Sequence, residues 1–555
     1  MEVKILSKLV KYEQEARTPV IKGIDTVANI VKTTVGPKGR NVLIRNNLDL
    51  PIITNDGVTI AKSIQLKDNA QDAGAQLIIS AANKTNEIAG DGTTTTTILA
   101  QAMIHKYYEL INSDEGATDN VVQTQRDMLK ASNEISDYLK SIAIPVTDNT
   151  MIERVATISS GSEITGKLIA DAFAQAGEHG SVIVEDSKTG IDNLVSIEGM
   201  KIPNGSVHQY LLSDRVKGKS QIFDGQILIT QDKLDNVTEL IPILDDIVKN
   251  GRNVLIMCDG IEFEPLNMIL MNKAKGVPIN IAIIRIPGFG ELREQLLQDL
   301  AIATGATVMG RENNLSLRDY NPSYLGVIQE ATITMDDTIL KFKDMFVPIG
   351  SDMTISLSSR RKQRAEELQA QLSNLGPSDN NKDALKRRIS NLISGISVIQ
   401  VGGNSEVEIK DKKLRIEDAI NSVQSAKEEG IVPGGGFSFL SAVIDAGDKK
   451  GSLGENVVYK SLESVTKQIA ENAGFDGPMT VAECYNKRLG FNALTGEYEN
   501  LLEAGVINSA KVDRYSLLNA TSIAATVITM GGLVIEENEK DYNVLQLQGP
   551  APALM

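Results

Sequence analysis

The spacing of apolar residues changes twice along the chain and separates a helical first stretch, a mixed middle and a helical end. In residues 1–140, apolar positions recur every three to four residues, which is typical of amphipathic helices. One helix is predicted from Asp68 to Ala89, and Gly90 is its stop signal. The next helix is predicted to bury a face that carries Leu99, Met103, Tyr107 and Leu110.

The middle of the chain, residues 200–345, alternates between short apolar runs and helical patterns. Strands are predicted at Gln226–Thr230, Asn253–Cys258, Ile279–Ile286 and Thr307–Met309. Helices are predicted near Val237–Val248, Pro265–Lys273 and Leu292–Ala303. Strands that alternate with helices predict an α/β domain with a largely parallel sheet.

Two charged helical stretches follow in residues 357–394, and the polar turn at 376–381 separates them, which predicts a helical hairpin. After residue 400 the pattern is helical again, with an interruption at Gly434-Gly435-Gly436. Because the first and last quarters are both mainly helical, we expect one domain to be built from both chain ends. The middle of the chain would then be inserted into it.

The charge of the chain excludes some partners. It carries 72 acidic and 56 basic residues, a formal net charge of −16, and such a surface repels nucleic acid and anionic membranes. Its two cysteines, Cys258 and Cys484, form neither a disulfide framework nor a metal-spaced cluster. Charges interrupt the first residues, and no apolar run approaches the ~18 residues of a membrane span. We therefore expect a soluble cytoplasmic protein.

Two glycine-containing segments are candidate phosphate sites. In residues 33–41, Gly36 and Gly39 flank a lysine, and glycines let backbone N–H groups approach an anion. Residues 90–97 read Gly-Asp-Gly followed by five threonines at a predicted helix start, where free N–H donors and the helix dipole favour phosphate. Asp91 could hold Mg²⁺ there. The alternatives are an ordinary turn for the first segment and a simple helix cap for the second.

Two further acidic residues are candidates for catalysis. Asp56 lies in an Asn-Asp-Gly turn and Asp418 in a helical stretch, where a turn residue and a solvated charge are the usual interpretations. An ATPase, however, needs one carboxylate to activate water and another for the metal. Neither a Walker A pattern nor a G-x-G-x-x-G pattern occurs in the sequence.

The middle domain has two amphipathic helices with apolar faces that allow two interpretations. One face carries Val237, Leu240, Ile241, Leu244 and Val248, and the other Leu266, Ile269, Leu270 and Met271. Core packing is the favoured interpretation from the pattern alone. The alternative is an exposed apolar groove for partners.

Taken together, the segments resemble those of the group I (GroEL-type) chaperonins, in order and along nearly the whole chain. The matching segments are Thr34–Asn41, Asp56–Thr59, Ala89–Thr95, Val184–Asp186, Glu198–Met200, Pro287–Gly290, Arg415–Ala419, Glu428–Gly436 and Asn492–Ala493. The chain is also divergent, in the way that chaperonins carried by some large bacteriophages are.

The resemblance implies an α+β multidomain chaperonin fold with a mainly helical equatorial domain, a small hinge (intermediate) domain and an α/β apical domain. The equatorial domain would comprise residues 1–141 and 429–555. The intermediate domain would comprise 142–197 and 397–428, and the apical, substrate-binding domain 198–396.

The resemblance also implies the site residues. ATP would contact Thr34, Val35, Gly36, Pro37, Asn55, Gly57, Gly92, Thr93, Thr94, Thr95, Ile158, Ser159, Gly434, Gly435, Asn492, Ala493 and Asn508. Asp91 would bind Mg²⁺, and Thr34 and Asn55 would lie near K⁺. Asp418 would activate the attacking water, with Asp56 assisting. Client proteins would bind Tyr210, Leu211, Ile241, Leu244, Leu266, Leu270 and Met271.

The activity that this implies is ATP-driven protein folding. Non-native client proteins would bind in a homo-oligomeric, heptameric ring in the cytoplasm of a bacterium or of a phage-infected host. ATP binding would close the hinge that carries Asp418. A separate cochaperonin lid is implied because the apical segment lacks the long insert of archaeal-type chaperonins.

The sequence departs from the family pattern at two positions of the implied nucleotide site. Asn55 stands where lysine is usual, and Asn508 stands where an aspartate normally meets the nucleotide. Two other functions are alternatives to a folding ATPase. A scaffold that has lost turnover is disfavoured because Asp56, Asp91 and Asp418 are all present. A metabolic nucleotide enzyme would need a second catalytic constellation, and none is evident.

Overall fold

The computed structural model describes residues 8–45, 51–112, 120–177, 180–187, 189–214, 218–310, 313–349, 353–373, 382–393, 396–447 and 451–536. The chain divides into two compact units. Unit 1 contains the described residues within 1–170, 188–190 and 401–555, and unit 2 those within 171–187 and 191–400. Both ends of the chain thus belong to one unit, and the middle of the chain belongs to the other. The finer division into equatorial, intermediate and apical segments stays a prediction.

Unit 1 is mainly helical. Its longer helices are α1 (Glu13–Val31), α3 (Asn69–Ala89), α4 (Thr93–Ile111), α5 (Val121–Ser141), α13 (Glu406–Glu429) and α18 (Ala510–Ile528). Its shorter helices are α2 (Gly57–Lys62), α6 (Asn149–Ser160), α14 (Phe437–Ala446), α15 (Leu453–Ser461), α16 (Ser464–Asn472) and α17 (Gly477–Lys487). Helix α7 (Glu163–Ala176) continues into unit 2.

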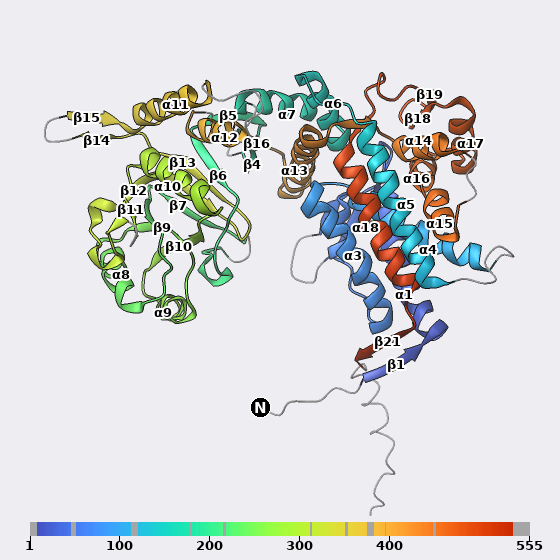
Figure 1. The fold of residues 1–555 in the computed structure, drawn as a ribbon, viewed down its shortest axis with the longest axis horizontal. Coiled ribbons are helices and arrows are strands. Elements are labelled where there is room, and N and C mark those ends of the chain that lie inside the picture. Colours follow the sequence, from blue (N-terminus) through green and yellow to red (C-terminus); the bar gives the residue numbers. More distant parts are fainter. Residues whose placement is uncertain are drawn as a thin grey trace, which may run out of the picture. The chain divides into compact units, whose positions relative to one another are not determined.

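Four short antiparallel strand pairs complete unit 1. They are β1 (Lys8–Tyr12) with β21 (Gly532–Glu536), β2 (Val42–Ile44) with β3 (Ile52–Thr54), β17 (Ile431–Pro433) with β20 (Ile507–Ser509), and β18 (Gly490–Asn492) with β19 (Glu497–Glu499). The first pair joins the two ends of the described chain, with Lys8 opposite Glu536 (Figure 1).

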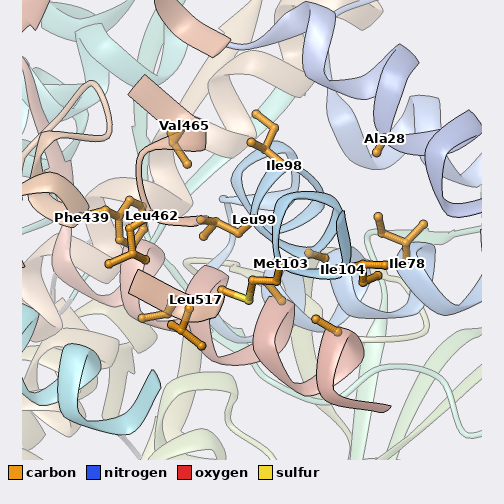
Figure 2. Packing of buried hydrophobic residues seen from close by; sticks show 14 of the residues in the cluster. Ala28, Ile78, Ile98, Leu99, Met103, Ile104, Phe439, Leu462, Val465 and Leu517 are labelled. Atoms are coloured by element: carbon orange, nitrogen blue, oxygen red, sulfur yellow. The ribbon is translucent and has the colours of Figure 1, made fainter. Parts of the chain in front are cut away.

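Helices α1, α3, α4, α5 and α18 pack together around the core of unit 1 (Figure 1). The predicted apolar face of α4 is buried in this core, and Leu99 and Met103 are completely inaccessible to solvent. Figure 2 shows Met103 pointing toward Leu517 of α18, and Leu99 toward Leu462. Burying side chains of this size is worth about 1.5–3 kcal/mol each, so α4 is firmly fixed in the unit.

The helix predicted from Asp68 to Ala89 is confirmed as α3. Asp68 caps its first turn by accepting a hydrogen bond from the Gln71 N–H at 2.9 Å. Gly90 ends it in the left-handed conformation, with φ +70°. A residue without a Cβ adopts that conformation at no steric cost, so the chain can turn sharply into the next helix.

Unit 2 contains an eight-stranded sheet. Its strands are β6 (Gly199–Ile202), β7 (Ser220–Phe223), β8 (Gln226–Thr230), β9 (Asn253–Cys258), β10 (Asn280–Arg285), β11 (Val308–Met309), β12 (Gly326–Ile333) and β13 (Thr338–Phe342). The predicted helices are confirmed as α8 (Val237–Asn250), α9 (Phe263–Ala274) and α10 (Gly290–Thr304).

The prediction of a largely parallel sheet is wrong for half of these strands. Strands β8, β9, β10 and β11 pair in parallel, but β12 pairs antiparallel with β7, β8 and β13, and β13 pairs antiparallel with β6. For the β12–β13 pair the reason is the short turn between the strands, which permits only a hairpin, whereas each parallel neighbour needs a helical crossover.

The remaining strands of unit 2 are β4 (Val182–Asp186), β5 (Asn193–Ile197) and β16 (Ile396–Val401), which form a three-stranded sheet, and the pair β14 (Phe346–Ile349) and β15 (Met353–Ser356). Helices α11 (Leu357–Ser373) and α12 (Lys382–Ile393) pack against each other, as predicted, and their predicted turn lies outside the described residues. Arg364 and Arg388 both donate to the buried Asp299, which ties the two helices to α10.

Within the described part of the chain, every helix is too short or too polar to cross a lipid bilayer.

Candidate active site

The predicted phosphate site lies at the start of α4. Gly92 precedes the helix with φ +91°, and no side chain of the described residues caps it. The first N–H groups of an uncapped helix point outward with the positive end of the helix dipole. This helix start can therefore bind an anionic group directly through its backbone.

The five consecutive threonines divide into two groups. Thr96 and Thr97 are buried, and their hydroxyls donate to the carbonyls of Gly92 and Thr94 at 2.9 and 2.7 Å. Both are thus structural. Thr93 is buried at the helix start, and Thr94 and Thr95 are partly exposed, so these three remain at the predicted phosphate position.

Asp91 is held by residues that lie far away in sequence. Its Oδ2 accepts hydrogen bonds from Ser422 Oγ of α13 at 2.7 Å and from Ser159 Oγ of α6 at 3.2 Å. Its Oδ1 accepts the Gly92 N–H at 2.5 Å. The structure thus brings Ser159, a predicted contact, to Asp91, and adds Ser422, which the sequence analysis missed.

Helix α13 carries both Asp418 and Ser422, which lie one helical turn apart and so face the same side of the helix. Farther along the helix, Ser425 Oγ donates to the Ala89 carbonyl at 2.7 Å, just before the phosphate loop. These contacts fasten α13 to the loop. The predicted catalytic acid therefore belongs to the same compact unit as Asp91 in this structure.

The surroundings of Asp418 favour its protonated form. Burial raises the pKa of this carboxyl well above its usual range. The negative charges of Asp91, Asp56 and the adjacent Glu417 raise the pKa further. Asp91 and Asp56 are therefore near enough to Asp418 for their charges to act on it. A bound cation would lower this pKa again.

Asp56 is the N-cap of α2. Its carboxylate accepts hydrogen bonds from the Val58 N–H at 3.0 Å and the Thr59 N–H at 2.9 Å. Gly57 comes so close to α4 that a methyl group there would lie 2.6 Å from Thr94 Oγ1 and 2.8 Å from Thr93 Oγ1. Gly57 therefore lies against the predicted phosphate position, and a larger residue at 57 would require the threonines at the start of α4 to shift.

The loop that carries Thr34, Val35, Gly36 and Pro37 follows α1. Its turn is closed by hydrogen bonds from the Gly39 N–H to the Gly36 carbonyl and from the Arg40 N–H to the Thr33 carbonyl. Gly36 has φ +86°. Asn472 of α16 donates to the carbonyls of Lys32 and Val35, both at 2.9 Å. Asn472 thus fixes the shape of the loop, which sequence analysis did not reveal.

A second group of predicted nucleotide contacts lies at a glycine turn. Gly434 donates its N–H to the Val506 carbonyl at 2.9 Å, and Gly435 has φ +62°. A methyl group on Gly435 would lie 3.5 Å from the Phe491 carbonyl, directly before Asn492 and Ala493. The structure therefore brings these four predicted nucleotide contacts together from two segments.

Asn508 lies on β20, opposite Val432 of β17 and close to the same glycine turn. Its Nδ2 donates to Asp513 Oδ1 at 2.5 Å, and Ser438 Oγ donates to Asp513 Oδ2 at 2.5 Å. Asp513 is buried, and burial raises its pKa to about 7. Asp513 and Ser438 were not predicted from the sequence.

Ile158, another predicted nucleotide contact, lies on α6 beside Ser159 and is 45% exposed.

The oxygen atoms at this site fit a metal ion that is held together with a nucleotide better than a metal ion that is held by protein side chains alone. Among the described residues, no cluster of three or more His, Cys, Asp and Glu side chains could hold a metal ion. Mg²⁺ usually takes one or two carboxylates together with substrate phosphates and water. Asp91 beside the uncapped helix start matches that arrangement. The buried Thr34 and the partly buried Asn55 offer only neutral oxygens, the type that K⁺ would need.

Unit 1 also has a polar pocket of about 470 Å³ that shares no residue with the predicted site. It lies between α1, α4 and α16. In its lining, His105 Nε2 contacts Asp25 Oδ1 at 2.7 Å. That hydrogen bond raises the pKa of His105. The predicted nucleotide contacts lie elsewhere, at the helix starts and glycine turns of the unit.

The predicted client-binding residues of unit 2 are of two kinds. Ile241 of α8, Met271 of α9 and Tyr210 are about half exposed, at 49%, 52% and 48%, and Leu266 and Leu270 are partly buried. Leu211 and Leu244 are buried in the core beneath them, so they are not accessible in this structure. The binding role of all seven stays a prediction.

The chain belongs to the TCP-1/cpn60 chaperonin family, because the model of that family matches residues 27–538. The match covers nearly the whole described chain, including both halves of unit 1 and all of unit 2. It confirms the resemblance that the sequence motifs indicated.

The fold is similar to that of a chaperonin of known structure. The chaperonin gp146 from bacteriophage EL 2 (Pseudomonas aeruginosa), crystallised in the presence of ATP-BeFx, matches with a TM-score of 0.70 and 21% identity over 96% of this chain and 100% of that one. A second crystal form of gp146 matches with a TM-score of 0.63 and 22% identity, over 96% and 99% of the two chains. At this level of identity the likeness shows the fold alone, an α+β multidomain chaperonin fold.

Proposed function

We propose that this chaperonin hydrolyses ATP at the start of α4 and uses the energy to promote the folding of client proteins. The observation that carries the proposal is the position of α13. This helix holds Ser422 against Asp91 and presents Asp418 one turn away on the same side. A base and a metal-binding carboxylate thus meet at an uncapped helix start.

Each part of the site would bind one part of ATP. The N–H groups of Thr93, Thr94 and Thr95 would hold phosphate oxygens, and Gly92, whose own N–H is donated to Asp91, would let the chain approach the phosphates closely. Asp91 would hold Mg²⁺, which would neutralise charge that develops on the phosphates. The loop from Thr34 to Pro37 and the glycine turn at Gly434–Gly435 would enclose the rest of the nucleotide. Asn492, Ala493 and Asn508 would lie at the sugar and base.

Asp418 would act as the general base. Its carboxylate would accept a proton from the water that attacks the γ-phosphorus. The bond from that phosphorus to the bridging oxygen would break, and ADP would keep the bond's electron pair. Asp56, already committed to capping α2, would assist through its negative charge. K⁺ near Thr34 and Asn55 is part of the proposal.

Unit 2 would bind non-native proteins. Exposed apolar side chains lie on or near α8, α9 and α10, namely Tyr210, Ile241, Phe263, Met271, Phe289 and Leu292. Unfolded chains expose apolar surface, and burying it is worth about 25 cal/mol per Å². ATP-driven movement of the hinge would then change how this surface is presented.

The assembly is proposed by family membership. Copies of the chain would form a ring, heptameric as in the GroEL-type proteins, with a separate cochaperonin as its lid, in the cytoplasm of a bacterium or of a phage-infected host. The equatorial, intermediate and apical segments would be the moving parts. Ring formation is checked by electron microscopy of the purified protein with and without ATP.

The test of the function compares the native chain with the Asp418→Ala variant. Phosphate release from ATP and the refolding yield of a denatured test protein are measured for both. We expect ATP to raise the yield only with the native chain. A scaffold without turnover would give background phosphate release for both, which would contradict the proposal. A yield that ATP does not change would leave only a holding role.

A further inference from the structure

Asp513 is a buried carboxyl group that the proposed hydrolysis does not use. It lies in the first turn of α18, and only 2% of its surface is exposed. A buried ionisable group is costly unless its oxygens are paired. Here each oxygen has a partner from a different segment, Asn508 of β20 and Ser438 of α14, both at 2.5 Å.

The two partners both belong to the proposed nucleotide site or adjoin it. Ser438 lies in the first turn of α14, directly after the Gly434–Gly436 turn. Asn508 is paired with Val432, which lies just before that turn. Asp513 therefore connects β20, which carries the proposed contact Asn508, to α14, which follows the proposed contacts at the glycine turn.

The carboxamide of Asn508 has a defined orientation because its two ends have different partners. Its Nδ2 donates one hydrogen to Asp513, and its Oδ1 accepts the Ser509 N–H at 3.0 Å. An amide nitrogen has two hydrogens, and an amide oxygen has two lone pairs. One N–H donor and one lone pair thus remain on a side chain that is only partly buried.

We propose that Asp513 is a positioning residue that orients Asn508, so that the site recognises the sugar hydroxyls of the nucleotide through an amide instead of a carboxylate. The inference rests on the proposed function. If the phosphates bind at the start of α4, the sugar and base are left to the glycine turn and Asn508. A hydroxyl both donates and accepts, which matches the two free positions of the amide.

The test measures how strongly the site distinguishes ADP from 2′,3′-dideoxy-ADP, which lacks both hydroxyls. Binding of each to the purified full-length chain is measured by calorimetry with Mg²⁺ present. We expect the native chain to prefer ADP about tenfold, the effect of one or two hydrogen bonds. Asp513→Ala should reduce this preference to about twofold or less and leave dideoxy-ADP binding unchanged.

Two further variants distinguish a role of Asp513 in orienting Asn508 from a role in stabilising the fold alone. Asp513→Asn retains an oxygen that can accept from Asn508, so it should keep the tenfold preference. Ser438→Ala removes the other partner of Asp513 and leaves the bond to Asn508, so it should keep the preference too. If Asp513→Ala prefers ADP as strongly as the native chain does, the inference is overturned.

If Asp513→Ala does not fold, exchanging the side chains of residues 508 and 513 tests the inference instead. Asn508→Asp would place two carboxyl groups in contact and should weaken ADP binding at least tenfold at pH 8, because both cannot ionise there cheaply. Adding Asp513→Asn restores one amide and one carboxylate, and should recover ADP binding to within about threefold. A double variant that binds no better than Asn508→Asp overturns the inference.

The same measurements distinguish the inference from the function on which it rests. A native chain that binds neither ADP nor ATP contradicts the proposed function itself. A native chain that binds ADP and dideoxy-ADP equally well contradicts only the sugar recognition.

Discussion

Ser422 Oγ donates a hydrogen bond to Asp91 Oδ2 at 2.7 Å across 331 positions of sequence. The bond joins a helix from the second half of the chain to the phosphate loop from the first. Because Asp418 lies one turn before Ser422, the bond also fixes where the proposed base is presented. The proposed hydrolysis would therefore depend on how firmly α13 is held in this place.

Removal of the Asp418 carboxylate should abolish turnover and leave nucleotide binding in place. A general base typically contributes about 10²–10⁴-fold to a rate, so Asp418→Asn should lower the ATPase rate by at least about a hundredfold. Its affinity for ATP should change less than about threefold, since no predicted ATP contact is lost. Phosphate release and calorimetric titration measure the two effects.

Glu406→Gln is the matched control for that experiment. Glu406 is an exposed acid in the first turn of the same helix, α13, three turns away from Asp418. Its loss should change the ATPase rate by less than about twofold. Equal losses in the two variants would mean that α13 contributes only its overall charge.

Loss of the Ser422 hydroxyl should weaken the binding of Mg²⁺ at the site. Ser422→Ala removes the shorter of the two serine hydrogen bonds that orient the Asp91 carboxylate. Residues that orient a metal ligand typically contribute about 10–100-fold to metal affinity or activity. We expect the Mg²⁺ concentration for half-maximal ATPase activity to rise by about tenfold. Ser441→Ala is the control, since Ser441 bonds only within α14.

Glycine at position 57 should be required for the nucleotide site. A methyl group there would lie 2.6 Å from Thr94 Oγ1, which is closer than real Cβ contacts, so the Thr93 and Thr94 side chains at the start of α4 would have to shift. Gly57→Ala should therefore weaken ATP binding at least tenfold. Gly531→Ala is the control, because a methyl group on Gly531 meets no atom within 4 Å. Equal affinities in the two variants would contradict the proposed position of the phosphates.

The local elements of this fold could be predicted from sequence, and the contacts between them could not. The spacing of apolar residues identified α3, α4, β8 and β9 because each depends on its own periodicity. The antiparallel β12–β13 hairpin was missed, since its strands carry no mark of their pairing partners. The different roles of the threonines could not be predicted either. Thr94 and Thr96 belong to the same run of five threonines, but only Thr96 faces the core.

The positioning residues were missed for the same reason. Asn472, Asp513 and Ser438 have no motif, and their partners lie in other elements. Ser422 is the exception in principle, because its helical spacing from Asp418 places both on one side of α13. Motifs identified residues that would contact the nucleotide, and the structure was needed for those that hold them.

Exposed and buried members of the proposed client surface should respond differently to substitution. Ile241→Ser and Met271→Ser change half-exposed side chains, so they should reduce the suppression of client aggregation and leave the unfolding temperature within about 2 °C. Leu244→Ala empties a buried core position and should destabilise unit 2 by about 2–5 kcal/mol. Light scattering of a denatured client and thermal unfolding separate the two outcomes. Full aggregation suppression by the Ile241→Ser, Met271→Ser double variant would contradict the proposed surface.

Asp513 should make the stability of unit 1 depend on pH. Its pKa in the folded chain is raised from the usual 3.8 to about 7, chiefly by burial. The folded state therefore holds this proton more tightly than the unfolded state, so the stabilisation is complete below about pH 4 and is lost as the pH rises through 7. The shift corresponds to roughly 4 kcal/mol. Denaturant unfolding is measured from pH 4 to 8 for the native chain and for Asp513→Asn, which has no proton to lose. The native chain should lose stability relative to this variant as the pH rises. Parallel profiles for the two proteins would contradict the prediction, because they would mean that the Asp513 carboxyl is ionised throughout.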